Sequence, residues 1–262
     1  MIQKEVTGLI LRATNVREAD RIVTIYTAEE GIVSALAPQA RSYKSRKMSS
    51  TQQFCYGKFI LERRGEYYRI LDADLIESFF GMRDSLEGLA LSSYFCEVLE
   101  DVATAEPGRD LLRLALNSLY ATAEKRAPRW KIKAAFEIRL AAIIGFLPDI
   151  LSCSECGTRN GDFLFHIMDG FLQCAACRQK QIDERREEPD EGRAHIVCPL
   201  SSGAKDALIY CIYCPVEKLY AFRLAPEDAA LFARAAETYL LHHLERSFTT
   251  LEFYKSVERE QP

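Results

Sequence analysis

Two cysteine pairs of the form Cys-x-x-Cys are separated by 17 residues, 157–173. They are Cys153-Ser154-Glu155-Cys156 and Cys174-Ala175-Ala176-Cys177. Each pair can aim two thiolates at one point, and two pairs complete a tetrahedron of sulfurs about 2.3 Å from a Zn²⁺ ion. Gly157 follows the first pair, where a tight turn needs a residue that tolerates a positive φ. Because four protein ligands leave no position open for water, the pattern predicts one structural zinc ion rather than a catalytic one.

The other cysteines are predicted to pack in the core. Cys211 and Cys214 form a third pair, but they lie in an apolar segment and have no partner pair. The isolated residues Cys55, Cys96 and Cys198 are interpreted in the same way. Two alternatives remain open: buried free thiols in place of the zinc site, and a thiol oxidoreductase that uses Cys211 and Cys214. The second alternative predicts a lowered cysteine pKa.

A segment rich in cations and aromatic rings runs from residue 39 to residue 64, opposed only by Glu62. Several cations along one track can neutralise phosphates, and exposed rings can stack on unpaired bases. The candidate DNA-binding residues are Arg41, Lys44, Arg46, Lys47, Arg63, Arg64, Tyr43 and Tyr56. Phe54 and Phe59 are expected in the core. The alternative interpretation is a solvated loop followed by ordinary core aromatics.

The composition of the whole chain indicates neither a membrane protein nor a strongly basic one. The net charge is −4, from 34 Lys and Arg against 38 Asp and Glu, so any nucleic-acid surface must be local. We find no signal sequence and no long apolar span, and we expect the protein in the cytoplasm. Phosphate-binding loops, nucleophile elbows and zinc-protease motifs are also missing, so we predict that the chain is not an enzyme.

Residues 1–80 are predicted to form a small β-barrel. Five short β-rich runs are separated by turn residues, and closing such a sheet removes its exposed edges. The runs are Val6–Leu11, Arg21–Tyr26, Ile32–Ala37, Lys58–Arg63 and Tyr67–Asp72. A five-stranded OB-fold barrel fits this pattern best, and an SH3-like barrel fits it nearly as well.

Helical spacing begins after residue 81, so the fold class is α+β. Predicted helices start at Leu86, span Leu111–Glu124 and Trp130–Ile144, and resume over Ser201–Leu208 and Pro226–Phe248. We expect Pro107 to end the first helix and Asp183–Arg193 to form a solvated loop. The predicted domains are the OB barrel over 1–80 and a helical domain over 81–250. The zinc finger is inserted within the helical domain at 150–180, and 251–262 form a C-terminal tail.

Taken in order, these parts resemble the RecO family of bacterial DNA repair and recombination mediators. The resemblance is carried by Arg21–Gly31 (RIVTIYTAEEG), by Ala37–Arg46 (APQARSYKSR), and by Phe136–Pro148 (FEIRLAAIIGFLP), which leads directly into the first cysteine pair. The order of features covers roughly residues 5 to 245. Arg41, Lys44, Arg46 and Lys47 match the family's basic loop after the third strand.

The resemblance implies an N-terminal OB domain that binds single- and double-stranded DNA, and a helical domain that carries the zinc insert. It further implies annealing of complementary strands and loading of the RecA recombinase together with RecR. The implied partners are RecR, the C-terminal tail of single-strand-binding protein and RecF, in the nucleoid of a bacterial cytoplasm. Two other classes stay open: a zinc-ribbon nucleic-acid-binding regulatory factor, and a scaffold whose zinc insert binds only protein.

Overall fold

The computed structural model describes residues 3–65, 67–104, 108–184 and 196–259. Contacts between residues divide the chain into two compact units. The barrel unit consists of Met1–Arg126 with Phe248–Pro262, and the insert unit is Ala127–Ser247. Among the helices of the described ranges, none has the length and apolar character needed to cross a membrane. The domain boundaries expected from the sequence stay predictions.

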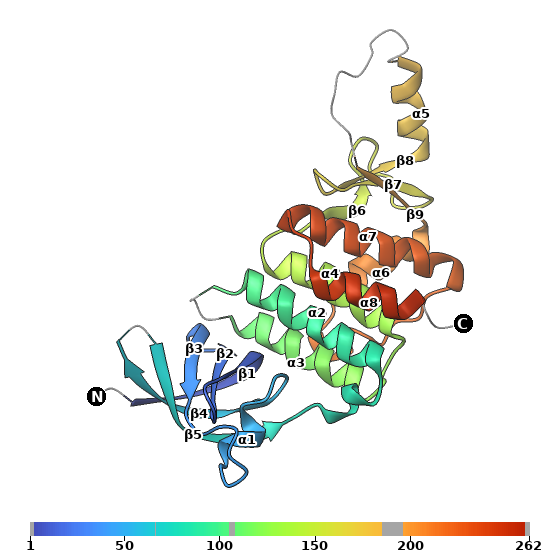
Figure 1. The fold of residues 1–262 in the computed structure, drawn as a ribbon. Helices are drawn as coiled ribbons and strands as arrows, with labels where there is room; N and C mark the ends of the chain where they lie inside the picture. Colours follow the sequence, from blue (N-terminus) through green and yellow to red (C-terminus); the bar gives the residue numbers. More distant parts are fainter. Residues whose placement is uncertain (1–2, 66, 105–107, 185–195, 260–262) are drawn as a thin grey trace. The chain divides into compact units, whose positions relative to one another are not determined.

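Five strands form a closed barrel in the order β1-β2-β3-β5-β4 (Figure 1). They are β1 (Gln3–Val16), β2 (Asp20–Thr27), β3 (Gly31–Ala37), β4 (Tyr56–Arg64) and β5 (Tyr67–Glu77). All neighbours are antiparallel except β3 and β5, where Ala35 lies opposite Tyr68. This order, with β1 paired to both β2 and β4, is that of an OB barrel. The predicted OB fold is confirmed, and each predicted strand lies within an observed one.

The barrel interior is filled by the side chains that alternation selects. Along β3, Val33, Ala35 and Ala37 are buried while Ser34 is exposed, as expected for a strand with one face in the core. Phe59 and Ile70 enter the same core from β4 and β5. Phe54 is also buried, so both phenylalanines expected in the core are found in buried positions.

Residues 38–55, here called loop 38–55, connect β3 to β4 and contain the short helix α1 (Lys47–Ser50). The C-terminal part of loop 38–55 is held to the barrel because the Ser50 hydroxyl donates to the Ala73 carbonyl at 3.1 Å. The N-terminal part is tied to the turn after β1, since the Arg41 amide donates to the Ala19 carbonyl at 2.9 Å. Arg21 on β2 also donates to the Thr51 hydroxyl at 3.0 Å. These bonds hold the basic segment against the barrel.

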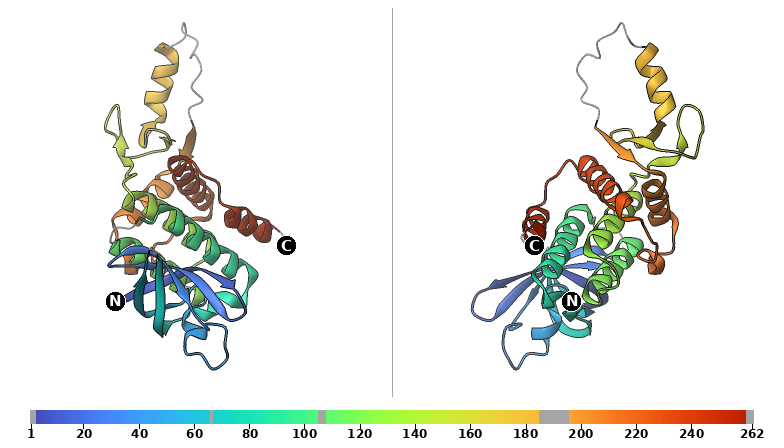
Figure 2. Two further views of the ribbon diagram at one scale, coloured as in Figure 1. Left: turned by 60° about the vertical axis from the view of Figure 1, so that its left-hand side comes forward. Right: turned by 90° about the vertical axis from the view of Figure 1, so that its right-hand side faces the viewer.

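Helices α2 (Leu86–Val102), α3 (Arg109–Ala123) and α8 (Thr249–Arg259) belong to the barrel unit. Figure 2 shows them from two further sides. Ser85 caps α2 by accepting a bond from the Gly88 amide at 3.1 Å. Pro107, the predicted helix stop, lies outside the described residues. The predicted C-terminal tail, 251–262, contains all of α8 except its first two residues, and α8 packs against α2 and buries Leu251 and Tyr254.

Glu97 of α2 binds the first turn of α8. Its carboxylate accepts bonds from the Thr250 amide at 3.0 Å and the Thr249 hydroxyl at 3.2 Å, and it also accepts from the Thr250 hydroxyl. Helix starts have unpaired amides, so a carboxylate in this position caps α8 from a neighbouring helix.

The insert unit combines helices with a second, smaller sheet. Helices α4 (Arg129–Ile143), α6 (Ser202–Tyr213) and α7 (Pro226–Leu244) pack together, with α4 against α7 as the largest helix pair. The sheet has the order β6-β8-β7-β9, formed by β6 (Asp149–Cys153), β7 (Phe163–His166), β8 (Phe171–Cys174) and β9 (Val197–Leu200). Helix α5 (Ala175–Glu184) follows β8 directly. Most of the predicted loop Asp183–Arg193 lies outside the described residues.

Candidate metal centre and nucleic-acid surface

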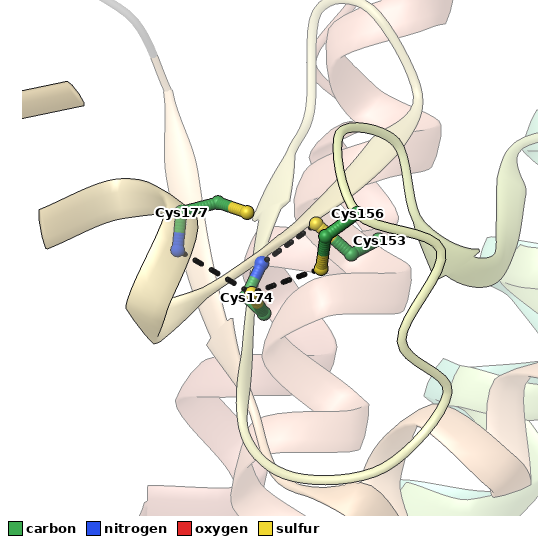
Figure 3. Close-up of side chains that lie close together, drawn as sticks. All are labelled: Cys153, Cys156, Cys174 and Cys177. Carbon is green, nitrogen blue, oxygen red and sulfur yellow. Dashed lines mark hydrogen bonds between the residues drawn. The ribbon is translucent and has the colours of Figure 1, made fainter. Parts of the chain in front are cut away.

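The four cysteines of the two predicted pairs meet at one point of the insert unit (Figure 3). Cys153 ends β6, Cys174 ends β8, and Cys177 lies in the first turn of α5. All four sulfurs lie within 4.8 Å of one another, and the sulfurs of Cys156 and Cys174 are 3.7 Å apart. Cys153 and Cys174 are buried, whereas Cys156 is exposed. The cluster therefore lies at the surface, with two of its sulfurs covered by the sheet.

Backbone amides point at these sulfurs. The Cys174 amide donates to the Cys153 sulfur at 3.4 Å, and the Cys177 amide donates to the Cys174 sulfur at the same distance. Although burial opposes the thiolate, amides at Cys156, Cys174 and Glu155 lower the pKa of Cys153 to about 6. The turn that sets up this geometry closes with the Gly157 amide on the Cys153 carbonyl at 2.9 Å, and Gly157 has the expected positive φ of 72°.

The donor set and its spacing fit a tetrahedral metal ion. Four sulfurs at about 2.3 Å from a zinc ion form a tetrahedron with edges of about 3.8 Å. The separation of 3.7 Å between Cys156 and Cys174 agrees with that edge. Burial, followed by hydrogen bonds to the other sulfurs, raises the pKa of Cys177. The cluster could therefore hold a metal ion, and thiolate ligands favour a soft or borderline ion such as Zn²⁺.

The third cysteine pair is arranged for packing and not for thiol chemistry. Cys211 is fully buried and Cys214 is 9% exposed. Burial raises the pKa of both thiols, the reverse of what a reactive cysteine needs. Arg139 of α4 donates to the carbonyls of Cys211, Ile212 and Cys214, which fixes the last turn of α6. Cys55, Cys96 and Cys198 are also buried, as predicted.

The predicted basic loop presents its cations unevenly. Arg41, Lys44 and Arg46 are exposed, and the Lys44 ammonium lies 5.6 Å from the centre of the Tyr43 ring. Tyr43 is 81% exposed, so its ring is available to a ligand. Lys47 is half-buried and donates to the Ile70 carbonyl at 3.4 Å. Its pKa is lowered by burial first and then by the charge of Arg69.

The structure does not bring all the predicted residues together. Tyr56 begins β4 and Arg64 ends it, so the two are roughly 25 Å apart along an extended strand. Burial also raises the pKa of Tyr56, which is half-covered. Arg63 donates to the Gly65 carbonyl at 3.3 Å, and Arg64 pairs with Glu62 at 2.7 Å. Arg63 and Arg64 therefore share one end of the barrel, and Tyr56 lies at the other.

Three further cations extend the basic surface beyond the segment that the sequence indicated. Arg17 lies in the turn between β1 and β2, Arg21 on β2 and Arg69 on β5. Arg21 is close enough to Arg41 that its pKa is lowered, by burial first and then by that charge. Each stands alone in the sequence among other residue types. The signal that could have found Arg17 is its position in a turn between predicted strands of an OB barrel, where ligands bind.

Two hollows border this surface, and Arg17, Leu36 and Tyr67 line both of them. The first, of about 330 Å³, is cationic, because Arg64 and Arg69 join Arg17 in its lining against Asp20, and it is also lined by Pro38 and Tyr68. The second, of about 320 Å³, is mostly apolar and is also lined by Val16, Ile22, Ser34 and Ala35. Tyr67 is 62% exposed and Ile22 is 42% exposed. A cationic hollow and an apolar hollow therefore adjoin at the ring of Tyr67.

Comparison with known proteins matches both halves of the chain to one family. The model of the recombination protein O N-terminal region matches residues 1–79, and that of the C-terminal region matches residues 83–252. The DNA repair protein RecO of Acetivibrio thermocellus is 32% identical over 254 residues, which are 97% of this chain and 96% of the relative. RecO proteins of Desulforudis audaxviator and Symbiobacterium thermophilum are 30% and 28% identical, and each comparison covers at least 96% of both chains. The chain belongs to the RecO family of DNA repair proteins.

Proposed function

We propose that the chain is a mediator of homologous recombination that binds single- and double-stranded DNA and catalyses no bond chemistry. In this role it anneals complementary strands and, with RecR, helps to load the RecA recombinase. Its further partners would be the C-terminal tail of single-strand-binding protein and RecF, in the bacterial nucleoid. Membership of the family of DNA repair proteins supports the role in general.

The observation that carries the proposal is the group of cations around the turn after β1, loop 38–55 and β5. Arg21 lies beside Arg41, and Lys47 lies beside Arg69, so that each pair brings like charges together. The carboxylates of Asp72 and Asp20 oppose the effect of Arg69, because their charges raise the pKa of Lys47. Like charges held close on a chain of net charge −4 are best accounted for by a polyanionic ligand.

Annealing follows from this surface by electrostatics alone. Two DNA strands repel each other through their phosphates, and a protein that neutralises both backbones lets the bases meet. Contacts to phosphates do not read sequence, so this binding should be insensitive to sequence and strongly weakened by salt. For the insert unit we propose one structural Zn²⁺ on Cys153, Cys156, Cys174 and Cys177. Bound there, the ion would join β6, β8 and α5.

The test is the rate of annealing of two complementary oligonucleotides at several salt concentrations. The variant Arg41→Ala/Lys44→Ala/Arg46→Ala removes the three exposed cations of loop 38–55 and leaves the half-buried Lys47 in place. Each lost phosphate contact lowers the salt slope of single-strand binding by about 0.7, so the slope should fall by about 2. Annealing should slow accordingly. The matched control, Lys218→Ala/Arg223→Ala/Arg234→Ala, removes three exposed cations from the insert unit and should keep the wild-type slope.

Equal loss in both triple variants would mean that net charge matters and the location does not, which would contradict the proposal. Preference for RNA over DNA of the same sequence would favour a regulatory nucleic-acid-binding factor instead. The same assay with strands coated by single-strand-binding protein, with and without RecR, tests the proposed partners. No effect of RecR on coated strands would remove the mediator role and leave DNA binding in place.

A further inference from the structure

Within the proposed DNA-binding function, we infer that the two hollows beside Tyr67 form a site for unpaired nucleotides, distinct from the contacts of loop 38–55. The site would take a base in its apolar hollow and the adjoining phosphate in its cationic hollow. It would therefore bind single-stranded DNA and reject a duplex. The inference rests on the proposed function and adds a division of labour within one barrel.

The lining of the apolar hollow is mostly hydrocarbon. Val16, Ile22, Ala35 and Leu36 line it with hydrocarbon, and Arg17 is its one charged lining residue in the described chain. An apolar hollow with one cation suits a flat, weakly polar group that carries a charge at its edge, as a nucleotide does. Ile22 is 42% exposed on β2, although the neighbouring Val23 is fully buried, so water now covers apolar surface that a base would cover.

Tyr67 is the first residue of β5, and its side chain is 62% exposed. A large aromatic residue on the barrel surface, between an apolar and a cationic hollow, is placed to stack on a base. Stacking needs an unpaired base, because both faces of a base in a duplex are already covered by its neighbours.

The cationic hollow is lined by the same tyrosine. Arg64 and Arg69 flank Tyr67 along the chain, and Arg17 reaches both hollows. A guanidinium group can bind two phosphate oxygens through two parallel hydrogen bonds. A strand whose base stacks on Tyr67 would have its phosphate among these three arginines. Asp20 also lines the hollow, and it is engaged by the Gln39 amide at 2.9 Å and by Arg17 at 3.8 Å.

Loop 38–55 has a different character. Its exposed residues Arg41, Lys44 and Arg46 are cations on a surface loop, and neither hollow is lined by them. Such residues can neutralise the phosphates of a single strand or of a duplex. One barrel would then hold an unpaired strand at the two hollows and contact a second strand by its backbone at loop 38–55.

The experiment measures fluorescence anisotropy of a labelled 20-nucleotide single strand and of the matching duplex, with the full chain at fixed salt. Tyr67→Ala should raise the Kd for the single strand roughly 5- to 150-fold, the range for loss of one stacked base, and leave the duplex Kd unchanged within about 2-fold. Tyr67→Phe keeps the ring and should bind as the wild type does. Tyr213→Ala, which removes a tyrosine that is 57% exposed in the insert unit, is the matched control.

A second arm uses a strand with abasic sites, on which wild type and Tyr67→Ala should bind equally because no base remains to stack. Equal weakening on single strand and duplex, or no weakening on the single strand, would overturn the inference while leaving the proposed function intact. Failure of the wild type to bind any DNA would instead overturn both. Thermal melts of each variant check that the exposed substitutions leave the fold unchanged.

Discussion

Replacing Lys133 by methionine tests the charged cluster in the core of the insert unit. Lys133 of α4 is 6% exposed, and its ammonium lies 2.8 Å from Glu137 and 2.6 Å from Glu237. Burial alone would lower the pKa of this lysine, but the two carboxylates more than offset it and the pKa is raised. While the two carboxylates are ionised, the charge of Lys133 therefore contributes stability that is fully present below the unfolded pKa of the lysine, near 10.5. That contribution is lost as the pH rises through the folded pKa.

The magnitude follows from what the variant leaves behind. The Glu137 side chain is fully buried, so Lys133→Met takes the ammonium away from a buried carboxylate, and removing one partner of a buried ion pair lowers the free energy of unfolding by about 3–5 kcal/mol. Glu237 is 23% exposed and is partly solvated, which favours the lower half of that range. For a unit of about 120 residues, at roughly 3–5 °C per kcal/mol, the melting temperature should fall by about 10–20 °C.

Calorimetry at pH 7 on the full chain measures this shift, and the barrel unit within the same sample serves as an internal reference. The triple variant Lys133→Met/Glu137→Leu/Glu237→Gln removes all three charges and should recover most of the stability, because uncharged replacements of similar volume avoid desolvating any charge. A loss under about 1 kcal/mol in the single variant would refute the argument that the cluster is a mutually dependent unit.

The remaining predictions concern the metal centre and α8. Cys174→Ser should lower the zinc content per chain, measured by elemental analysis, and should lower the melting temperature of the insert unit while the barrel unit keeps its own. A Cys198→Ser variant changes a buried cysteine outside the cluster and should retain the metal; loss of metal in both would point to general unfolding. Glu97→Ala removes three hydrogen bonds at the start of α8 and should destabilise its docking by about 1–2 kcal/mol. Hydrogen exchange should then speed up in Thr249–Arg259 more than in α3, and uniform exchange across both helices would contradict the capping role.

The metal cluster could be predicted from the sequence because its signal is local. Each Cys-x-x-Cys pair is a single turn, and Gly157 marks the turn by its tolerance of positive φ, so little knowledge of the fold was needed. The barrel strands were predictable for the same reason, since alternation within one strand reveals which face is buried. Zinc as the particular metal stays a prediction.

The nucleic-acid surface could be predicted only in part because it is assembled by strand pairing. Arg41 and Arg46 are close in sequence and were found together. Arg17 and Arg69 line one hollow because β3 pairs with β5 and the sheet closes into a barrel through the pairing of β4 with β1. No local sequence pattern reveals these pairings. For Tyr56, closeness in sequence was misleading. It stands near Arg63 in sequence, but an extended strand carries it to the opposite end of the barrel.

The origin of α8 at the far end of the chain has a consequence for biosynthesis. The barrel unit consists of residues up to Arg126 and resumes only at Phe248, after the whole insert unit has been made. On the ribosome, the barrel and helices α2 and α3 are made before α8, so the surface that contacts Leu251 and Tyr254 is still uncovered. At that stage Glu97 has not yet met the hydrogen-bond donors of α8. A nascent chain would therefore complete this unit last, and a stop codon shortly before residue 249 would release a protein with a barrel and an insert unit but without the helix that packs against α2.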